Sequence, residues 1–76
     1  MTYNLRMQLQ INGEARDFPD GMNVSGLVAQ LGMKGDRVAV ELNLEIVPRP
    51  NWEATVLKNG DKLEIVHFVG GGAPSA

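Results

Sequence analysis

Residues 5–18 read LRMQLQINGEARDF, and the first seven of them alternate strictly between apolar and polar side chains. This alternation has the period of two that is typical of a strand with one buried face. The side chains predicted to share that face are Leu5, Met7, Leu9 and Ile11. Asn12-Gly13 follows directly and suits a tight hairpin turn, so residues 14–18 are expected to return as a second strand. The alternation fails at Phe18, which predicts a bend or bulge near that residue.

A short amphipathic helix is expected next. Apolar residues recur there at the spacing of one helix face, and they are Val24, Leu27, Val28 and Leu31. Asn23 suits the N-cap, and Gly32 marks the expected end of the helix. Gly26 lies inside this segment, where a glycine weakens a helix, and we expect it to let the helix lie close to the sheet.

The remaining residues predict two more strands and several short pieces. Alternation over residues 38–42 indicates a third strand, with Val38, Val40 and Leu42 on one side. Residues 45–47 form a short extended piece, residues 50–54 fit one helical turn, and residues 58–61 (KNGD) fit a turn. Residues 62–69 are expected to form the last strand.

This order predicts an α+β fold in which one helix covers one face of a mixed sheet of four or five strands. The helix serves as the crossover that lets the last strand pair in parallel with the first and lie centrally. This is the β-grasp arrangement. We assign residues 1–69 to this domain and residues 70–76 to a glycine-rich C-terminal tail.

The tail reads GGGAPSA, in which every residue is small or proline and none is ionisable. Glycine loses much conformational freedom on ordering, and the tail offers no large apolar side chain to offset that loss. We therefore expect a flexible tail that suits insertion into another protein's narrow active site. A merely frayed terminus is the alternative.

The last strand also predicts a docking face. Leu63 and Ile65 should point at the helix, so Val66 and Phe68 should point to the uncovered face, where Ala39 of the third strand joins them. The predicted partner-binding residues are Ala39, Val66, Phe68, Gly70 and Gly71. The alternative is that a loop or residues 44–55 cover Val66 and Phe68.

Composition excludes several function classes. The net charge of −2 and the interspersed charges argue against a nucleic-acid partner, which a basic stripe normally recognises. With no cysteine and one histidine, no metal site is expected, and His67 is interpreted as a polar residue near a sheet edge. Trp52 is interpreted as a packing residue. No signal peptide, membrane span or catalytic constellation is evident, so we expect a cytoplasmic carrier or substrate and no enzyme.

Five pieces of the sequence resemble the ThiS sulfur carriers of thiamine biosynthesis, a ubiquitin-like family. They are VELN (residues 40–43), IVPR (residues 46–49), Trp52, Gly60-Asp61 and EIVHFVGGG (residues 64–72). The resemblance implies no bound cofactor. It implies that an E1-like enzyme uses ATP and Mg to adenylate the Gly72 carboxylate, next to Gly71. A sulfur donor such as a cysteine desulfurase then yields a thiocarboxylate, and a thiazole synthase takes the sulfur.

Family members usually end at the diglycine that aligns with Gly71 and Gly72, whereas Ala73-Pro74-Ser75-Ala76 follow here. Because some related carriers resemble a precursor of this kind, we interpret the chain as a precursor that a JAMM-type peptidase trims after Gly72. The alternatives are that these four residues block activation or that they are a remnant of cloning.

The sequence is also consistent with other functions. A sister carrier would supply sulfur for molybdopterin or cysteine, and a non-conjugated β-grasp interaction domain would leave the tail idle. An RNA-binding β-grasp module conflicts with the acidic charge balance. We expect a monomer, because a carrier must detach from one partner to reach the next.

Overall fold

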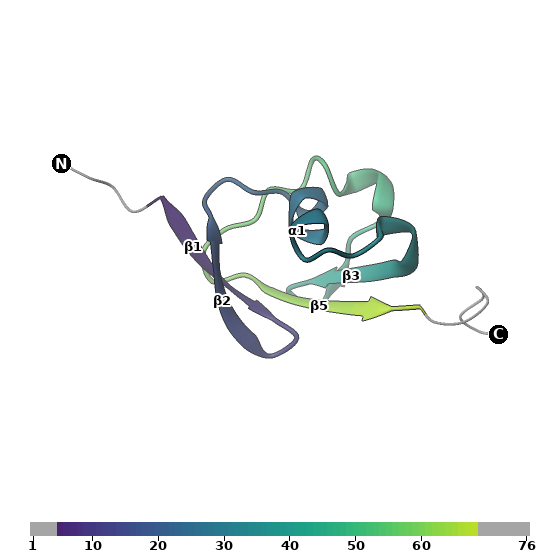
Figure 1. The fold of residues 1–76 in the computed structure, drawn as a ribbon, viewed down its shortest axis with the longest axis horizontal. Helices are drawn as coiled ribbons and strands as arrows, with labels where there is room; N and C mark the ends of the chain where they lie inside the picture. Colours follow the sequence, from purple (N-terminus) through teal and green to yellow (C-terminus); the bar gives the residue numbers. More distant parts are fainter. Residues whose placement is uncertain (1–4, 69–76) are drawn as a thin grey trace.

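The fold is arranged around its last strand. The structure is a computed structural model that describes residues 5–68. In chain order the elements are β1 (Arg6–Ile11), β2 (Glu14–Pro19), α1 (Val24–Gln30), the 3-10 turn η1 (Gly35–Arg37), β3 (Val38–Leu42), β4 (Glu45–Ile46), the 3-10 turn η2 (Arg49–Asn51) and β5 (Lys62–His67). Figure 1 shows their arrangement, with α1 lying over one side of the sheet.

The five strands form one mixed sheet in the order β2-β1-β5-β3-β4. Strands β1 and β5 run parallel through the pairs Gln10↔Lys62 and Ile11↔Leu63, while β3 pairs antiparallel with β5 over its whole length. The last strand is therefore central, and the segment containing α1 provides the crossover between β2 and the rest of the sheet. The predicted α+β fold with a central, parallel last strand is confirmed.

The first hairpin closes through a turn with positive φ at both central residues, 51° at Asn12 and 86° at Gly13. The predicted bulge at Phe18 is wrong, because the pairing of β1 with β2 runs without interruption from Arg6↔Pro19 to Ile11↔Glu14. Phe18 faces Met7 and is buried. The alternation of apolar and polar residues is weak in β2 because β2 is an edge strand, and its other residues on the face of Phe18 are exposed.

Helix α1 begins as predicted. The Asn23 side chain accepts a hydrogen bond from the Gly26 N–H at 2.7 Å, and Gly32 follows the helix at φ 75°. The predicted role of Gly26 is wrong. A Cβ built at Gly26 would meet the Asn23 Oδ1 at 3.1 Å and the Met22 Cγ at 3.3 Å, so the cap and not the sheet is its nearest neighbour.

The core lies between α1 and one face of the sheet. Its buried side chains are Met7, Leu9, Ile11, Phe18, Val24, Leu27, Val28, Val38, Val40, Trp52, Leu57, Leu63 and Ile65. Leu5 does not join the face that its alternation predicts, and it is 64% exposed because it precedes the first paired residue of β1. Among residues 5–68, no helix covers the opposite face of the sheet (Figure 1).

The short pieces also lie close to where the sequence places them. The helical turn expected over residues 50–54 is a 3-10 turn at η2, and its Pro50 stands in the first turn as predicted. Strand β5 ends at His67, two residues before the expected end. The predicted boundary between domain and tail at residues 69 and 70, and the tail itself, lie outside the described residues.

Candidate functional site

Strand β5 ends shortly before the glycines at residues 70–72 of the sequence. The contacts that hold β5 therefore matter for the candidate site at these glycines. Strand β1 ends at Ile11, and the side chain of Asn12 then continues its pairing with β5. Asn12 Oδ1 accepts a hydrogen bond from the Ile65 N–H at 2.7 Å, and Asn12 Nδ2 donates to the Ile65 carbonyl at 3.2 Å. The Asn12 backbone N–H also donates to the Leu63 carbonyl at 2.8 Å. One turn residue therefore satisfies polar groups of β5 that would otherwise lack a strand partner.

A second turn asparagine holds the other end of β5. Asn43 follows β3 with φ 49°, and its Oδ1 accepts from the Lys62 N–H at 3.0 Å. Its Nδ2 donates to Asp61 Oδ1 at 3.1 Å. At the C-terminal end, the Phe68 N–H donates to the Arg37 carbonyl at 2.8 Å, so β5 is fixed up to the last described residue.

The uncovered face of the sheet contains a shallow groove of about 480 Å³, which we call the sheet-face groove. Its lining residues are Ala39, Val40, Glu41, Leu44, Ile46, Glu64 and Val66. Strand pairing sets Ala39 opposite Val66, and Ile46 opposite Glu41. Three large apolar side chains stay open to solvent there, with exposed fractions of 57% for Val66, 64% for Ile46 and 88% for Leu44. Exposed apolar groups gathered in one groove are typical of a surface that meets a partner.

The structure brings together two of the predicted partner-binding residues, Ala39 and Val66. Phe68 is half-buried and does not line the groove, and Gly70, Gly71 and Gly72 lie outside the described residues. The alternative that a loop or residues 44–55 cover Val66 is wrong, since Val66 stays 57% exposed.

Leu44 and Ile46 also belong to this face, although the sequence patterns did not predict them. The only available signal was the large apolar Leu44 directly after Asn43 in a turn, where small or polar residues are usual.

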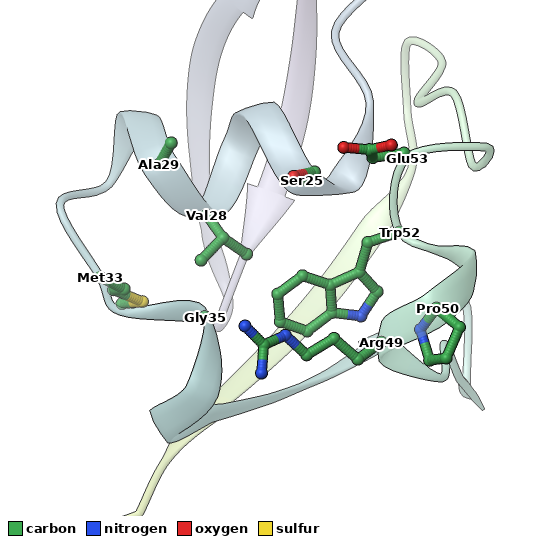
Figure 2. A pocket seen from close by; sticks show the side chains of 9 residues that line it. All are labelled: Ser25, Val28, Ala29, Met33, Gly35, Arg49, Pro50, Trp52 and Glu53. Carbon is green, nitrogen blue, oxygen red and sulfur yellow. The ribbon is translucent and has the colours of Figure 1, made fainter.

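A different groove, also of about 480 Å³, lies on the helix side of the sheet (Figure 2). Figure 2 shows the Arg49 guanidinium reaching along the Trp52 indole towards Gly35, with Ser25 and Glu53 at the far end. The guanidinium carbon lies 5.7 Å from the indole centroid. Trp52 is only 5% exposed, and its Nε1 donates to the Val47 carbonyl at 2.9 Å. Trp52 is therefore a packing residue, as predicted, and the Arg49 guanidinium lies over its ring.

His67 is exposed, and it lies on the central strand β5, opposite Val38, and not near a sheet edge as predicted. The misplacement follows from topology, because the last strand of the chain is the middle strand of the sheet. Within residues 5–68 there is no group of three or more histidine, cysteine, aspartate or glutamate side chains arranged to hold a metal ion. No helix in the same part of the chain has the length and apolar character needed to cross a membrane.

Known proteins resemble this chain in both sequence and fold. Over 70 residues it is 50% identical to a thiazole synthase of Paramagnetospirillum magneticum, a match that covers 92% of this chain and 22% of that protein. The chain thus spans about a fifth of the length of the thiazole synthases it matches. It is 30% identical over 66 residues to the sulfur carrier protein ThiS of Escherichia coli, covering 87% of this chain and 100% of that one.

The crystal structure of the thiamine biosynthesis protein ThiS of Geobacter metallireducens superimposes with a TM-score of 0.76. That protein is 36% identical, and the match covers 87% of this chain and 100% of that one. The model of the ThiS family matches residues 9–72, which includes the whole sheet from Leu9 onwards and all three glycines. Family model, relatives and fold agree, and this chain belongs to the ThiS family.

Proposed function

We propose that this chain is a sulfur carrier of thiamine biosynthesis and that Gly72 holds the sulfur as a thiocarboxylate. The observation that carries the proposal is the position of the glycines in the sequence. They follow the central strand, which is held from both sides, and the family match runs to Gly72. A rigid body that presents a terminal glycine suits a carrier whose reactions take place inside its partners.

Glycine suits this chemistry because it has no Cβ to hinder attack at its carbonyl carbon, and because its backbone adapts to the conformation that an enzyme imposes. ATP, with Mg, first converts the Gly72 carboxylate to an acyl adenylate and releases pyrophosphate. A sulfur nucleophile then attacks the carbonyl carbon, so a C–S bond forms and AMP leaves. If the donor is a persulfide, a thiol then reduces the S–S bond and frees the thiocarboxylate. The partner enzyme holds these reactants together, and ATP and Mg are its cofactors.

Activation needs a free carboxylate at Gly72, whereas the sequence continues with Ala73. We propose that a peptidase, of the JAMM type by analogy with related carriers, cleaves the bond between Gly72 and Ala73. The end of the family match at Gly72 supports this cleavage site. Intact mass of the protein from its native cells tests it. A chain shortened by four residues is expected, and a chain that is never shortened contradicts the proposal.

The partners follow from this chemistry. An E1-like enzyme adenylates Gly72, a cysteine desulfurase or a similar donor supplies sulfur, and a thiazole synthase receives it. The similarity of this chain to part of a thiazole synthase supports the last partner, since segments found within one protein commonly act together. Ala39 and Val66 of the sheet-face groove, together with Phe68, Gly70 and Gly71, form the proposed contact surface. We expect a cytoplasmic monomer.

Loading with sulfide tests the proposal directly. The chain ending at Gly72 and the full chain are each incubated with the adenylating enzyme of the same organism, ATP, Mg and sulfide, and their intact masses are measured. The shorter chain should gain the mass difference between one sulfur and one oxygen atom, whereas the uncut full chain should not change. Failure of the shorter chain to gain this mass contradicts the sulfur-carrier function and favours a non-conjugated interaction domain.

A further inference from the structure

We propose that the sheet-face groove binds a lysine or arginine side chain of the adenylating enzyme, seated between Glu41 and Glu64 and surrounded by apolar contacts. This inference rests on the proposed function for the identity of the partner. It adds the chemistry that the partner must present, namely a basic side chain in the middle of an apolar surface.

Two carboxylates face each other in the sheet-face groove. Glu41 of β3 and Glu64 of β5 lie directly opposite each other on the uncovered face, and both line the groove. Directly opposed residues on neighbouring strands have Cβ atoms about 4.5–5.5 Å apart, and like charges at this spacing destabilise a sheet. Within residues 5–68, none of the seven residues that line the groove is basic. Lys62, on the same face of β5, lines the adjoining hollow together with both glutamates. A cation supplied by a partner would relieve the repulsion between the two carboxylates.

Leu44 contributes a strained and exposed apolar side chain to the groove. Its φ of 75° lies in the left-handed region, which a residue with a Cβ rarely adopts, and glycine or asparagine is usual at such a turn position. Its side chain is 88% exposed, so burial within this chain does not compensate for the backbone strain. Strain without internal compensation is typical of functional sites. Leu44 stands at the groove beside Ile46 and Val66, where a partner surface would bury all three side chains.

Two unfavourable arrangements thus occur in one groove, a pair of opposed carboxylates and a strained, exposed leucine. A partner with a central cation and an apolar surround compensates both, because it pairs the charges and buries the apolar side chains. A purely apolar partner would leave two carboxylates desolvated, and a purely basic one would leave the leucine exposed.

The position of the groove favours the enzyme that acts on the tail. Val66 lines the groove, and Gly72 follows six residues later. Six residues reach at most about 20 Å, so an enzyme docked on the groove has the Gly72 carbonyl within that distance. The adenylating enzyme must hold the Gly72 carbonyl in its active site, and we assign the docking on the groove to this enzyme.

The test compares affinity with stability for variants of the chain ending at Gly72. Binding to the adenylating enzyme is measured by calorimetry at two salt concentrations, and the melting temperature of each free variant is recorded. The variants are the double variant E41Q/E64Q and Leu44→Asn. The controls are Glu53→Gln, which removes a carboxylate from the helix-side groove, and Lys62→Gln.

The double variant should bind about tenfold more weakly, with a smaller salt dependence, because the partner's cation loses its counter-charges. Its melting temperature should nevertheless rise by roughly 1–5 °C, because the repulsion is gone. Leu44→Asn should also weaken binding without lowering the melting temperature. Both controls should bind at least as tightly as the parent chain. A fall in stability that parallels the loss of affinity would mean that the glutamates are structural, and it would overturn the proposal.

Suppose that the parent chain binds the enzyme and is loaded with sulfur. If E41Q/E64Q then binds with unchanged affinity, the groove proposal alone is overturned. A parent chain that neither binds nor is loaded overturns the proposed function, and the groove proposal falls with it. The loading assay therefore separates the two failures.

Discussion

Replacing Asn12 by glycine isolates the contribution of a turn side chain to the position of β5. Glycine accepts the φ of 51° at this position, so the turn itself survives. The change removes the two side-chain hydrogen bonds to Ile65, at 2.7 and 3.2 Å, and keeps the backbone hydrogen bond to Leu63. A typical hydrogen bond contributes about 0.5–1.5 kcal/mol net, so the two together contribute about 1–3 kcal/mol.

Two further effects change the expected loss of unfolding free energy. Asn12 is exposed, so water can replace part of what is lost, and we expect the hydrogen bonds to contribute about 1–2 kcal/mol. Glycine also adds freedom to the unfolded chain, which destabilises by about 0.5–1 kcal/mol. Leu44→Gly controls for this second term, since Leu44 also has positive φ. Relief of its left-handed strain, about 1–2 kcal/mol, should leave the control neutral or more stable.

Urea denaturation measures both variants, and hydrogen exchange of the Ile65 amide provides a local readout. We expect Asn12→Gly to lose about 1.5–3 kcal/mol of unfolding free energy and to expose the Ile65 amide to faster exchange. If Asn12→Gly stays within about 0.5 kcal/mol of the parent chain and the Ile65 amide keeps its protection, the Asn12 side chain does not hold β5 and the reasoning is refuted.

Three further changes test the helix side of the molecule by the same urea assay. Trp52→Phe removes the hydrogen bond to the Val47 carbonyl and part of a buried ring, and should cost about 1–3 kcal/mol; no loss would place the indole outside the core. Gly35→Ala places a Cβ 3.2 Å from the Trp52 Cζ3 and should cost about 1 kcal/mol, whereas a stabilised variant would show that the loop moves freely away from Trp52. Asn23→Ala removes the N-cap hydrogen bond to Gly26 and should cost about 1 kcal/mol, and an unchanged denaturation midpoint would mean that the cap does not stabilise α1.

Local patterns predicted most of this fold. The alternation of Met7, Leu9 and Ile11 and the Asn12-Gly13 turn are short-range signals, and the structure confirms the hairpin that they predict. The prediction failed where an element's surroundings decide the outcome. Phe18 lies in a regular ladder. Its alternation was misleading because β2 is an edge strand whose other residues on the face of Phe18 are exposed, and the residues of β2 alone do not reveal that position.

The candidate site was less predictable because its parts come together only in the folded sheet. Asn12 was interpreted as a turn residue, yet its side chain bonds to Ile65, 53 positions away. The Glu41↔Glu64 pair depends on the register between β3 and β5, which strand patterns alone do not fix. Leu44 was missed because the exposure of a turn residue depends on what packs against the turn.

Fragmentation of the loaded protein in a mass spectrometer tests whether Gly72 carries the sulfur. The chain ending at Gly72 is loaded as described above and broken into C-terminal fragments. We predict that the smallest fragment containing Gly72 carries the added mass and that no fragment lacking Gly72 does. Sulfur found on any other residue, or loading that persists equally when Gly72 is deleted, contradicts this prediction.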